Sequence, residues 1–190
     1  MNKAAEVLAA WEQKEEEVLA RLRNSEAGIG VARPEQVMGK TGMEIFAAML
    51  AGELPVPPIA ETLGFFLVEV DRGRAVFQGR PSKRYYNPLG TVHGGWYATL
   101  LDSAVGCAVH TCMPAGKSYT TLELKVNMVR ALTDKVPLLR AEGQVIHLGG
   151  QTATADGKLY GPDGKLYAHA STTCLIFDFP PAGRGERLGQ

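Results

Sequence analysis

The chain has 190 residues, 45% hydrophobic and 21% charged, which is ordinary for one globular domain with room for an appendage. Its 20 lysine and arginine residues balance 20 aspartate and glutamate residues, which excludes a globally basic nucleic-acid-binding surface and weakly favours an oligomer. Three cysteines predict no disulfide framework. Because no apolar stretch has the length of a membrane span and the N-terminus lacks a signal-peptide core, we expect a cytoplasmic protein that binds neither nucleic acid nor membrane.

Residues 1–58 are expected to form a helical extension that packs on the main domain or on a neighbouring chain. Apolar residues recur at helical spacing over residues 3–23, which predicts a first helix. A second helix is marked at both ends, because Thr41 and Glu44 have the spacing of a capping box and Gly52 stands where a helix would stop. The proline-rich segment PVPPI that follows predicts a stiff connector.

The main domain is expected over residues 59–178, where strand patterns surround one long helical pattern. Strands are predicted over residues 65–70, 75–79, 121–129, 138–146, 151–160 and 165–177, and the helix over residues 95–112. One helix packed against antiparallel strands places the chain in the α+β class. The glycine-rich segment 179–190 is expected to be a flexible tail.

The long predicted helix carries one charged residue, Asp102, in an otherwise apolar run. A helix that is apolar nearly all round is buried, and burying an unpaired carboxylate is costly. Asp102 is therefore either a structural residue bonded to a nearby hydroxyl or cation, or a reacting group.

The sequence before this helix, NPLGTVHGG, favours the second interpretation. The first N–H groups of a helix lack helical partners and carry the positive end of its dipole, and glycines there let a substrate approach the backbone. Such a helix start can polarise a carbonyl and stabilise an oxyanion. The glycines that follow His93, the amide of Asn87 and the acid Asp102 together form a moderately specific set for chemistry at a carbonyl.

Other kinds of site lack their sequence signatures. The histidines at 93, 110, 147 and 169 have no ligand-like spacing, so no metal site is expected. The chain contains no phosphate loop, no dinucleotide fingerprint and no nucleophile elbow of the G-x-S-x-G type.

The motif N-P-L-G-T-V-H-G-G-x6-D-S-A, followed by Y-T-T-L-E-L-K-V-N, resembles the hotdog-fold acyl-CoA thioesterases of the phenylacetate-degradation type. The resemblance runs from about residue 59 to residue 178. It implies one long central helix wrapped by a curved antiparallel sheet, and homodimers that usually pair into homotetramers. It also implies hydrolysis of an acyl-CoA thioester to the free acid and CoA, with no cofactor beyond the CoA of the substrate.

The resemblance also implies a role for individual residues of the motif. Asp102 matches the acid that attacks the thioester or activates water, and the backbone N–H of Gly94 matches the group that polarises the thioester carbonyl. Asn87 matches an amide that helps to hold the carbonyl or the water, and His93 matches the residue that shapes the turn. Thr121 is the best match to an assisting hydroxyl on the strand after the helix.

Further positions match the substrate-binding segments of the family by place alone. They are Gly95, Thr120, Val129, Arg130, Ala131, Leu148, Gly149, Gly150, Gln151 and Thr152. Lys83, Arg84, Arg130 and Arg140 are candidate ligands for the CoA phosphates, although solvated surface is the ordinary role of such residues. Tyr85, Tyr86, Trp96 and Tyr97 either line an aromatic pocket or belong to the core.

Helix geometry and the resemblance together predict that the active site is shared between two chains. Gly94 and Asp102 are eight residues apart on one helix, which separates them by roughly 12 Å along its axis. One carbonyl cannot lie within about 3 Å of both. Either one of them is not catalytic, or they belong to different chains. The resemblance also favours the second option, and we expect each site to combine Asn87 and Gly94 of one protomer with Asp102 of the partner subunit. Two other functions remain open, a non-catalytic acyl-CoA binding module and, with less support, a hotdog dehydratase.

Overall fold

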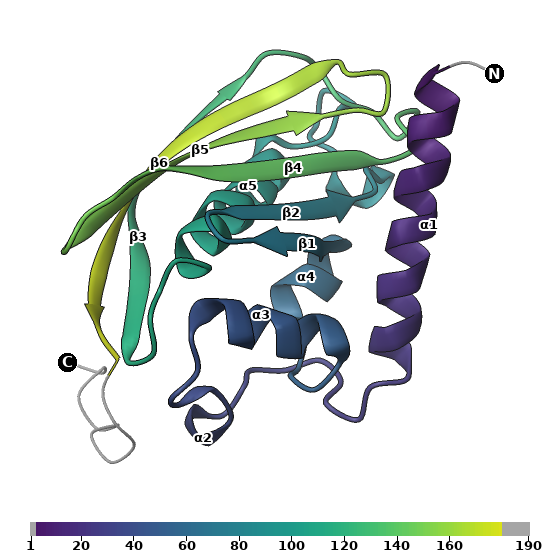
Figure 1. The fold of residues 1–190 in the computed structure, drawn as a ribbon. Helices are drawn as coiled ribbons and strands as arrows, with labels where there is room; N and C mark the ends of the chain where they lie inside the picture. The colour runs from purple at the N-terminus through teal and green to yellow at the C-terminus, as the bar shows by residue number, and fades with distance from the viewer. Residues whose placement is uncertain (1–2, 180–190) are drawn as a thin grey trace.

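The computed structural model describes residues 3–179, and within them one long helix lies against a six-stranded antiparallel sheet (Figure 1). The helix is α5 (Gly94–His110). The strands are β1 (Phe65–Asp71), β2 (Arg74–Gly79), β3 (Lys117–Met128), β4 (Leu139–Leu148), β5 (Thr152–Tyr160) and β6 (Leu166–Asp178). Their order across the sheet is β1-β2-β4-β5-β6-β3, which leaves β1 and β3 at the two edges. The predicted α+β hotdog arrangement is confirmed.

Most predicted boundaries agree with the observed elements to within two residues, and β3 is the exception. It begins at Lys117, four residues before the predicted start, because Ser118, Tyr119 and Thr120 already pair with β6. This pairing is a long-range contact that local sequence patterns do not reveal. Of the predicted tail, residues 180–190 lie outside the described residues.

The helix α5 packs closely on the sheet because two strands present glycine to it. Its sheet-facing side chains are completely buried; they are Leu100, Leu101, Ala104, Val105, Ala108 and Val109. A Cβ atom at Gly143 on β4 would lie 2.2 Å from the Ala104 carbonyl oxygen, and one at Gly157 on β5 would lie 2.7 Å from the Val105 side chain. The close packing of α5 on the sheet therefore depends on the absence of a side chain at Gly143 and at Gly157.

The N-terminal extension consists of α1 (Lys3–Arg23), α2 (Pro34–Val37), α3 (Gly42–Ala51) and α4 (Pro58–Leu63). The predicted capping box is confirmed, since Glu44 N–H donates to Thr41 Oγ1 at 3.3 Å and Thr41 N–H donates to Glu44 Oε2 at 2.7 Å. The interpretation of residues 55–59 as a connector is only partly right, because α4 begins at Pro58. Proline suits the first turn of a helix, where its missing N–H costs nothing.

The extension wraps around the β1 edge of its own sheet. In Figure 1, α3 and α4 lie below β1, and α1 stands at the side of the sheet. Alternate residues of β2 face opposite ways, as a strand requires: Ala75 and Phe77 join the core under α5, whereas Val76 packs with Val18 of α1. The extension thus contacts the main domain on the outer face of the sheet as well as at its edge.

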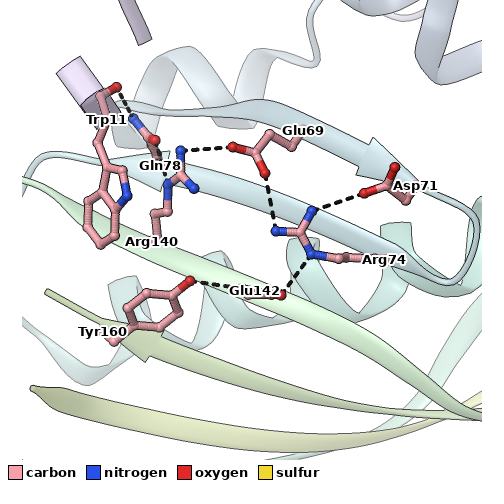
Figure 2. A network of polar contacts seen from close by, with 8 residues as sticks. All are labelled: Trp11, Glu69, Asp71, Arg74, Gln78, Arg140, Glu142 and Tyr160. Carbon is pink, nitrogen blue, oxygen red and sulfur yellow. Dashed lines mark hydrogen bonds and ion pairs between the residues drawn. The ribbon is translucent and has the colours of Figure 1, made fainter. Parts of the chain in front are cut away.

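A network of polar side chains holds α1 on this outer face (Figure 2). Gln78, fully buried on β2, donates to the Trp11 carbonyl at 3.0 Å, and Arg140 donates to Gln78 Oε1 at 2.8 Å. The Arg140 guanidinium lies 4.9 Å from the centroid of the Trp11 ring and pairs with Glu69 at 2.9 Å. Arg140, a candidate for CoA phosphates, is therefore engaged in holding the extension.

The charged stretch of α1 contains one buried residue. The Glu15 side chain is 8% exposed and pairs with Arg80 of the main domain. Its burial is specified by this distant arginine and not by the local pattern. Among residues 3–179, no helix has both the length and the apolar character needed to cross a membrane.

Replacing Gly143 with alanine is expected to lower the free energy of unfolding by about 3 kcal/mol, because the new methyl group would overlap the backbone of α5. Gly150→Ala is the matched control, since nothing lies within 4 Å of a Cβ atom there, and a change within about 0.5 kcal/mol is expected. Urea denaturation measures both variants. Equal stability of the two would contradict glycine-dependent packing of α5.

Candidate active site

The start of α5 leaves one backbone donor free. His93 is the N-cap residue, and its Nδ1 accepts a hydrogen bond from Gly95 N–H at 2.9 Å. Trp96 N–H donates to the His93 carbonyl at 3.0 Å. Gly94 N–H, by contrast, has no hydrogen-bond partner among residues 3–179. Of the first three N–H groups of the helix, the one at Gly94 is therefore available to a ligand.

The side chain of Asn87 is fixed by its own loop in a way that leaves only a donor free. Its Oδ1 accepts from Leu89 N–H at 2.9 Å and from Thr91 N–H at 3.2 Å, while its Nδ2 donates to Thr91 Oγ1 at 3.0 Å. An amide nitrogen carries two hydrogens, so one remains unused. Asn87 can thus donate to a carbonyl oxygen, but its own oxygen is committed to the loop.

Asn87 and Gly94 line one surface pocket of about 320 Å³ with several of the predicted substrate-binding residues. The other lining residues are Thr91, Val92, Tyr97, Met128, Val129, Arg130 and Ala131. The Tyr97 hydroxyl donates to the Arg130 carbonyl at 3.2 Å, and burial raises the pKa of Tyr97 to about 12, so the hydroxyl stays protonated. This pocket, with Asn87 and Gly94 as its donors, is called the donor half-site below.

Asp102 lies further along α5 and turns toward β3. It is half-buried, and its Oδ1 accepts a hydrogen bond from the Thr121 hydroxyl at 3.2 Å. Its Oδ2 has no partner among residues 3–179, yet no buried side-chain oxygen in that range lacks one, so Oδ2 reaches solvent. Thr120 is exposed, as expected for the neighbouring position on a strand. Asp102 and Thr121 form the acid half-site.

The thiol of Cys107, close to the acid half-site, is not a competing nucleophile. Burial and, to a lesser extent, the charge of Asp102 raise the pKa of Cys107 to about 12. A thiol with that pKa stays protonated near neutral pH and is a poor nucleophile. Among residues 3–179, no group of three histidine, cysteine or acidic side chains is placed to hold a metal ion.

The predicted segment from Leu148 to Thr152 forms the turn between β4 and β5, away from the donor half-site of its own chain. Ala153, directly after it, pairs with Cys174 of β6, and Cys174 pairs with Thr121 of β3. The segment therefore lies at the same end of the sheet as the acid half-site. The predicted residues fall into two groups within one chain.

The structure also assigns places to residues whose roles the sequence left open or did not suggest. Trp96 and Tyr97 are 2% and 3% exposed and belong to the core, although Tyr97 also borders the pocket. Met128 was missed: a Cβ atom at Gly94 would lie 2.8 Å from its terminal methyl group, so its side chain covers the helix start. Its only signal in the sequence is its position directly before the predicted Val129 segment.

Comparison with known proteins agrees with this geometry. A family model described as the thioesterase superfamily matches residues 89–168. A phenylacetic acid degradation-related protein of Ralstonia eutropha JMP134 is 33% identical, with a TM-score of 0.63, over 68% of this chain and 98% of that chain. The chain belongs to the thioesterase superfamily. It is thus an enzyme of the thioester-hydrolase class, and the family match includes His93, Gly94, Asp102 and Thr121.

More distant relatives of this thioesterase extend the comparison. A 1,4-dihydroxy-2-naphthoyl-CoA hydrolase of Listeria monocytogenes is 26% identical over 101 residues, which are 53% of this chain and 80% of the relative. The PaaI protein from the phenylacetic acid degradation operon of E. coli is 23% identical over 63% of this chain and 83% of its own, with a TM-score of 0.57. The second likeness concerns the fold alone.

Replacing His93 with alanine is expected to lower the free energy of unfolding by about 1 kcal/mol, because Gly95 N–H loses its capping partner. His93→Ser is expected to restore most of this loss, since serine is a good N-cap residue. Thermal or urea unfolding of the two variants provides the measurement. If serine were as destabilising as alanine, the cap would not be what His93 contributes.

Proposed function

We propose that this thioesterase hydrolyses an acyl-CoA thioester to the free acid and CoA in active sites shared by two copies of the chain. Membership of the thioesterase superfamily and the similarity to a CoA-thioester hydrolase support the substrate class. The observation that carries the mechanism is the pair of unused groups on α5: the free N–H of Gly94 and the solvent-accessible Oδ2 of Asp102. The Gly94 N–H can donate a hydrogen bond to the carbonyl oxygen of the thioester. Oδ2 of Asp102 can attack the carbonyl carbon or accept a proton from a water molecule.

The length of α5 supports a site that is shared between chains. Eight residues of helix separate Gly94 from Asp102 by roughly 12 Å, whereas two groups that act on one carbonyl must both lie within about 3 Å of it. A donor half-site of one chain and an acid half-site of a second chain satisfy both distances. The proposed homodimer therefore completes two equivalent sites, as a twofold axis requires.

The edge strand β3 is the surface proposed for pairing of the two chains. It has 12 residues, pairs within its chain only with β6 as far as residues 3–179 are concerned, and carries Thr121 of the acid half-site. A long edge with unpaired backbone groups is a template for another strand. Leu122 and Met128 on this strand are 60% and 51% exposed, which favours its being covered by a second copy. Pairing of such dimers into tetramers stays a prediction.

The chemistry follows from which atoms are already engaged. Gly94 N–H and the unused Asn87 N–H donate to the thioester carbonyl oxygen and stabilise the negative charge that develops there. Thr121 holds Oδ1 of Asp102, so Oδ2 of the partner subunit's Asp102 either attacks the carbonyl carbon or removes a proton from the water that attacks it. The C–S bond breaks, CoA leaves as the thiolate and takes up a proton, and water supplies the oxygen of the acid.

The two roles of Asp102 differ in the fate of an oxygen atom. A nucleophilic carboxylate forms an anhydride with the acyl group, and its hydrolysis in ¹⁸O-water can leave label in Asp102. A general base takes up no label. Single-turnover hydrolysis followed by mass spectrometry of the peptide that contains Asp102 separates them.

Asp102→Asn is expected to lower kcat by about a thousandfold or more, with little change in KM, because the substitution keeps the volume and removes only the reacting oxygen. The assay is release of free thiol from acyl-CoA. Asp163→Asn is the matched control, since Asp163 lies in the turn before β6 and pairs with Lys165 there. A near-normal kcat in Asp102→Asn would remove Asp102 from the mechanism, and release of no thiol by the unmodified chain would favour a binding module.

Mixing two inactive variants tests the shared site. Asp102→Asn and Asn87→Ala are co-refolded, so that half of the dimers are mixed and each mixed dimer holds one intact site and one doubly defective site. Activity is expected to recover to about a quarter of the unmodified level if sites act independently.

Gly94→Ala is a second variant of the donor half-site for the same experiment. Alanine keeps the backbone N–H, but its methyl group is expected to block the close approach of the thioester carbonyl and so to inactivate the site. The methyl group displaces only the flexible end of Met128 and leaves the loop bonds of Asn87 in place. Subunit exchange is verified with differently tagged chains. Exchange without recovery for both donor variants would contradict a site shared between chains.

A further inference from the structure

A second cavity, of about 100 Å³, lies between α5 and the N-terminal extension. Most of its lining comes from residues before β1, and residues of β1 and β2 together with Ser103 and Cys107 of α5 complete it. The phenylalanines at 46, 65, 66 and 77 contribute to its walls, and no charged side chain of the described chain lines it. An apolar cavity with so few polar groups suits an uncharged, apolar ligand.

The cavity lies beside the acid half-site on the same helix. Ser103 directly follows Asp102, and Cys107 is one turn further along, so the two polar lining residues lie on one side of α5, which the cavity shares with β1, β2 and the extension. Both are half-buried, whereas the sheet-facing residues of α5 are completely buried. The adjacency of Asp102 and Ser103 in the helix places the cavity next to the carboxylate.

The far wall of the cavity is fixed to the core. Gly42 N–H, at the start of α3, donates to the Met113 carbonyl at 2.9 Å, and a Cβ atom at Gly42 would lie 1.7 Å from the His110 carbonyl oxygen. Phe46, one turn further along α3, meets the His110 ring edge to face at 5.1 Å. This end of the extension is therefore packed tightly against the end of α5. Because α3 forms one wall of the cavity, this packing fixes the position of that wall.

We infer that this cavity receives the acyl group of the thioester, and that the N-terminal extension of the chain that supplies Asp102 selects which acyl group is hydrolysed. The inference rests on the proposed thioesterase function and adds the substrate class to it. An engineered apolar cavity of about 150 Å³ holds a benzene ring, so the smaller cavity here suits a short aliphatic acyl group. A charged acyl group is excluded, because its charge would be buried without a partner.

The first experiment compares acyl groups in the unmodified full-length chain. Butanoyl-CoA and succinyl-CoA both carry four-carbon acyl groups, and they differ in that the succinyl group ends in a carboxylate. The kcat/KM for butanoyl-CoA is expected to exceed that for succinyl-CoA by roughly a hundredfold or more. It is expected to exceed that for acetyl-CoA by roughly tenfold, since each buried methylene contributes about fourfold. Equal values for butanoyl-CoA and succinyl-CoA would overturn the inference.

The second experiment changes the cavity without changing the reacting groups. Ile59 lines the cavity and is 51% exposed, so Ile59→Ala enlarges the cavity at little cost in stability. The ratio of kcat/KM for octanoyl-CoA to that for butanoyl-CoA is expected to rise about tenfold. Ile29→Ala is the matched control, because Ile29 belongs to the same extension, is 49% exposed and does not line the cavity. Its ratio is expected to stay that of the unmodified chain.

A filling variant tests the cavity from the opposite side. Ser103→Leu places a larger side chain on its floor, and the preference for butanoyl-CoA over acetyl-CoA is expected to disappear. Cys107→Leu makes the same test one turn away should the first variant fail to fold. Thiol release with unchanged acyl preferences in Ile59→Ala and in the filling variant would overturn this inference alone. Absence of thiol release from every acyl-CoA would instead overturn the proposed function.

Discussion

The rigid helix α5 fixes the positions of the two groups that are proposed to act on the substrate. The free N–H at Gly94 and the carboxylate of Asp102 lie on α5, whose buried side is locked onto the sheet through Gly143 and Gly157. Because α5 cannot bend or slide within that packing, no side-chain motion brings the two groups to the same carbonyl. The proposed shared site meets this constraint with a second copy of the chain, for which β3, an edge strand of the described sheet beside Asp102, offers the place.

Polar groups, together with the apolar contact of Val18 with Val76, hold the N-terminal extension on the sheet. Gln78, Arg140 and Glu69 form a connected series beneath Trp11. Buried polar groups contribute little net stability, but they penalise any register in which a member loses its partner. The network thus fixes where α1 lies along the sheet. It also occupies Arg140, so Arg130, at the donor half-site, is the better candidate for a CoA phosphate.

The sequence predicts those features whose causes are local. The capping box of α3, the apolar run of α5 and the HGG turn each arise from residues within a few positions of one another, and the positions of α5, Gly94 and Asp102 follow from them. The early start of β3, the burial of Glu15 and the engagement of Arg140 depend on partners that are distant in sequence. The cavity above Ser103 is the clearest case, because its lining includes residues of α1, α3, α4, β1, β2 and α5.

The residues proposed to act on the thioester carbonyl and the residues proposed to enclose the acyl group lie in different parts of the chain. The residues proposed to act on the carbonyl lie in or next to the segment that matches the thioesterase superfamily, whereas most of the cavity wall precedes that segment. The match to the Ralstonia protein spans 98% of that chain but only 68% of this one, so this chain carries structure with no counterpart there. A fold with a fixed reaction centre can change its substrate by changing such an added wall, without disturbing the groups that react. Similarity in the motif therefore supports the same type of reaction among members of the family. The identity of the acyl group that is hydrolysed must be inferred from the residues that enclose it.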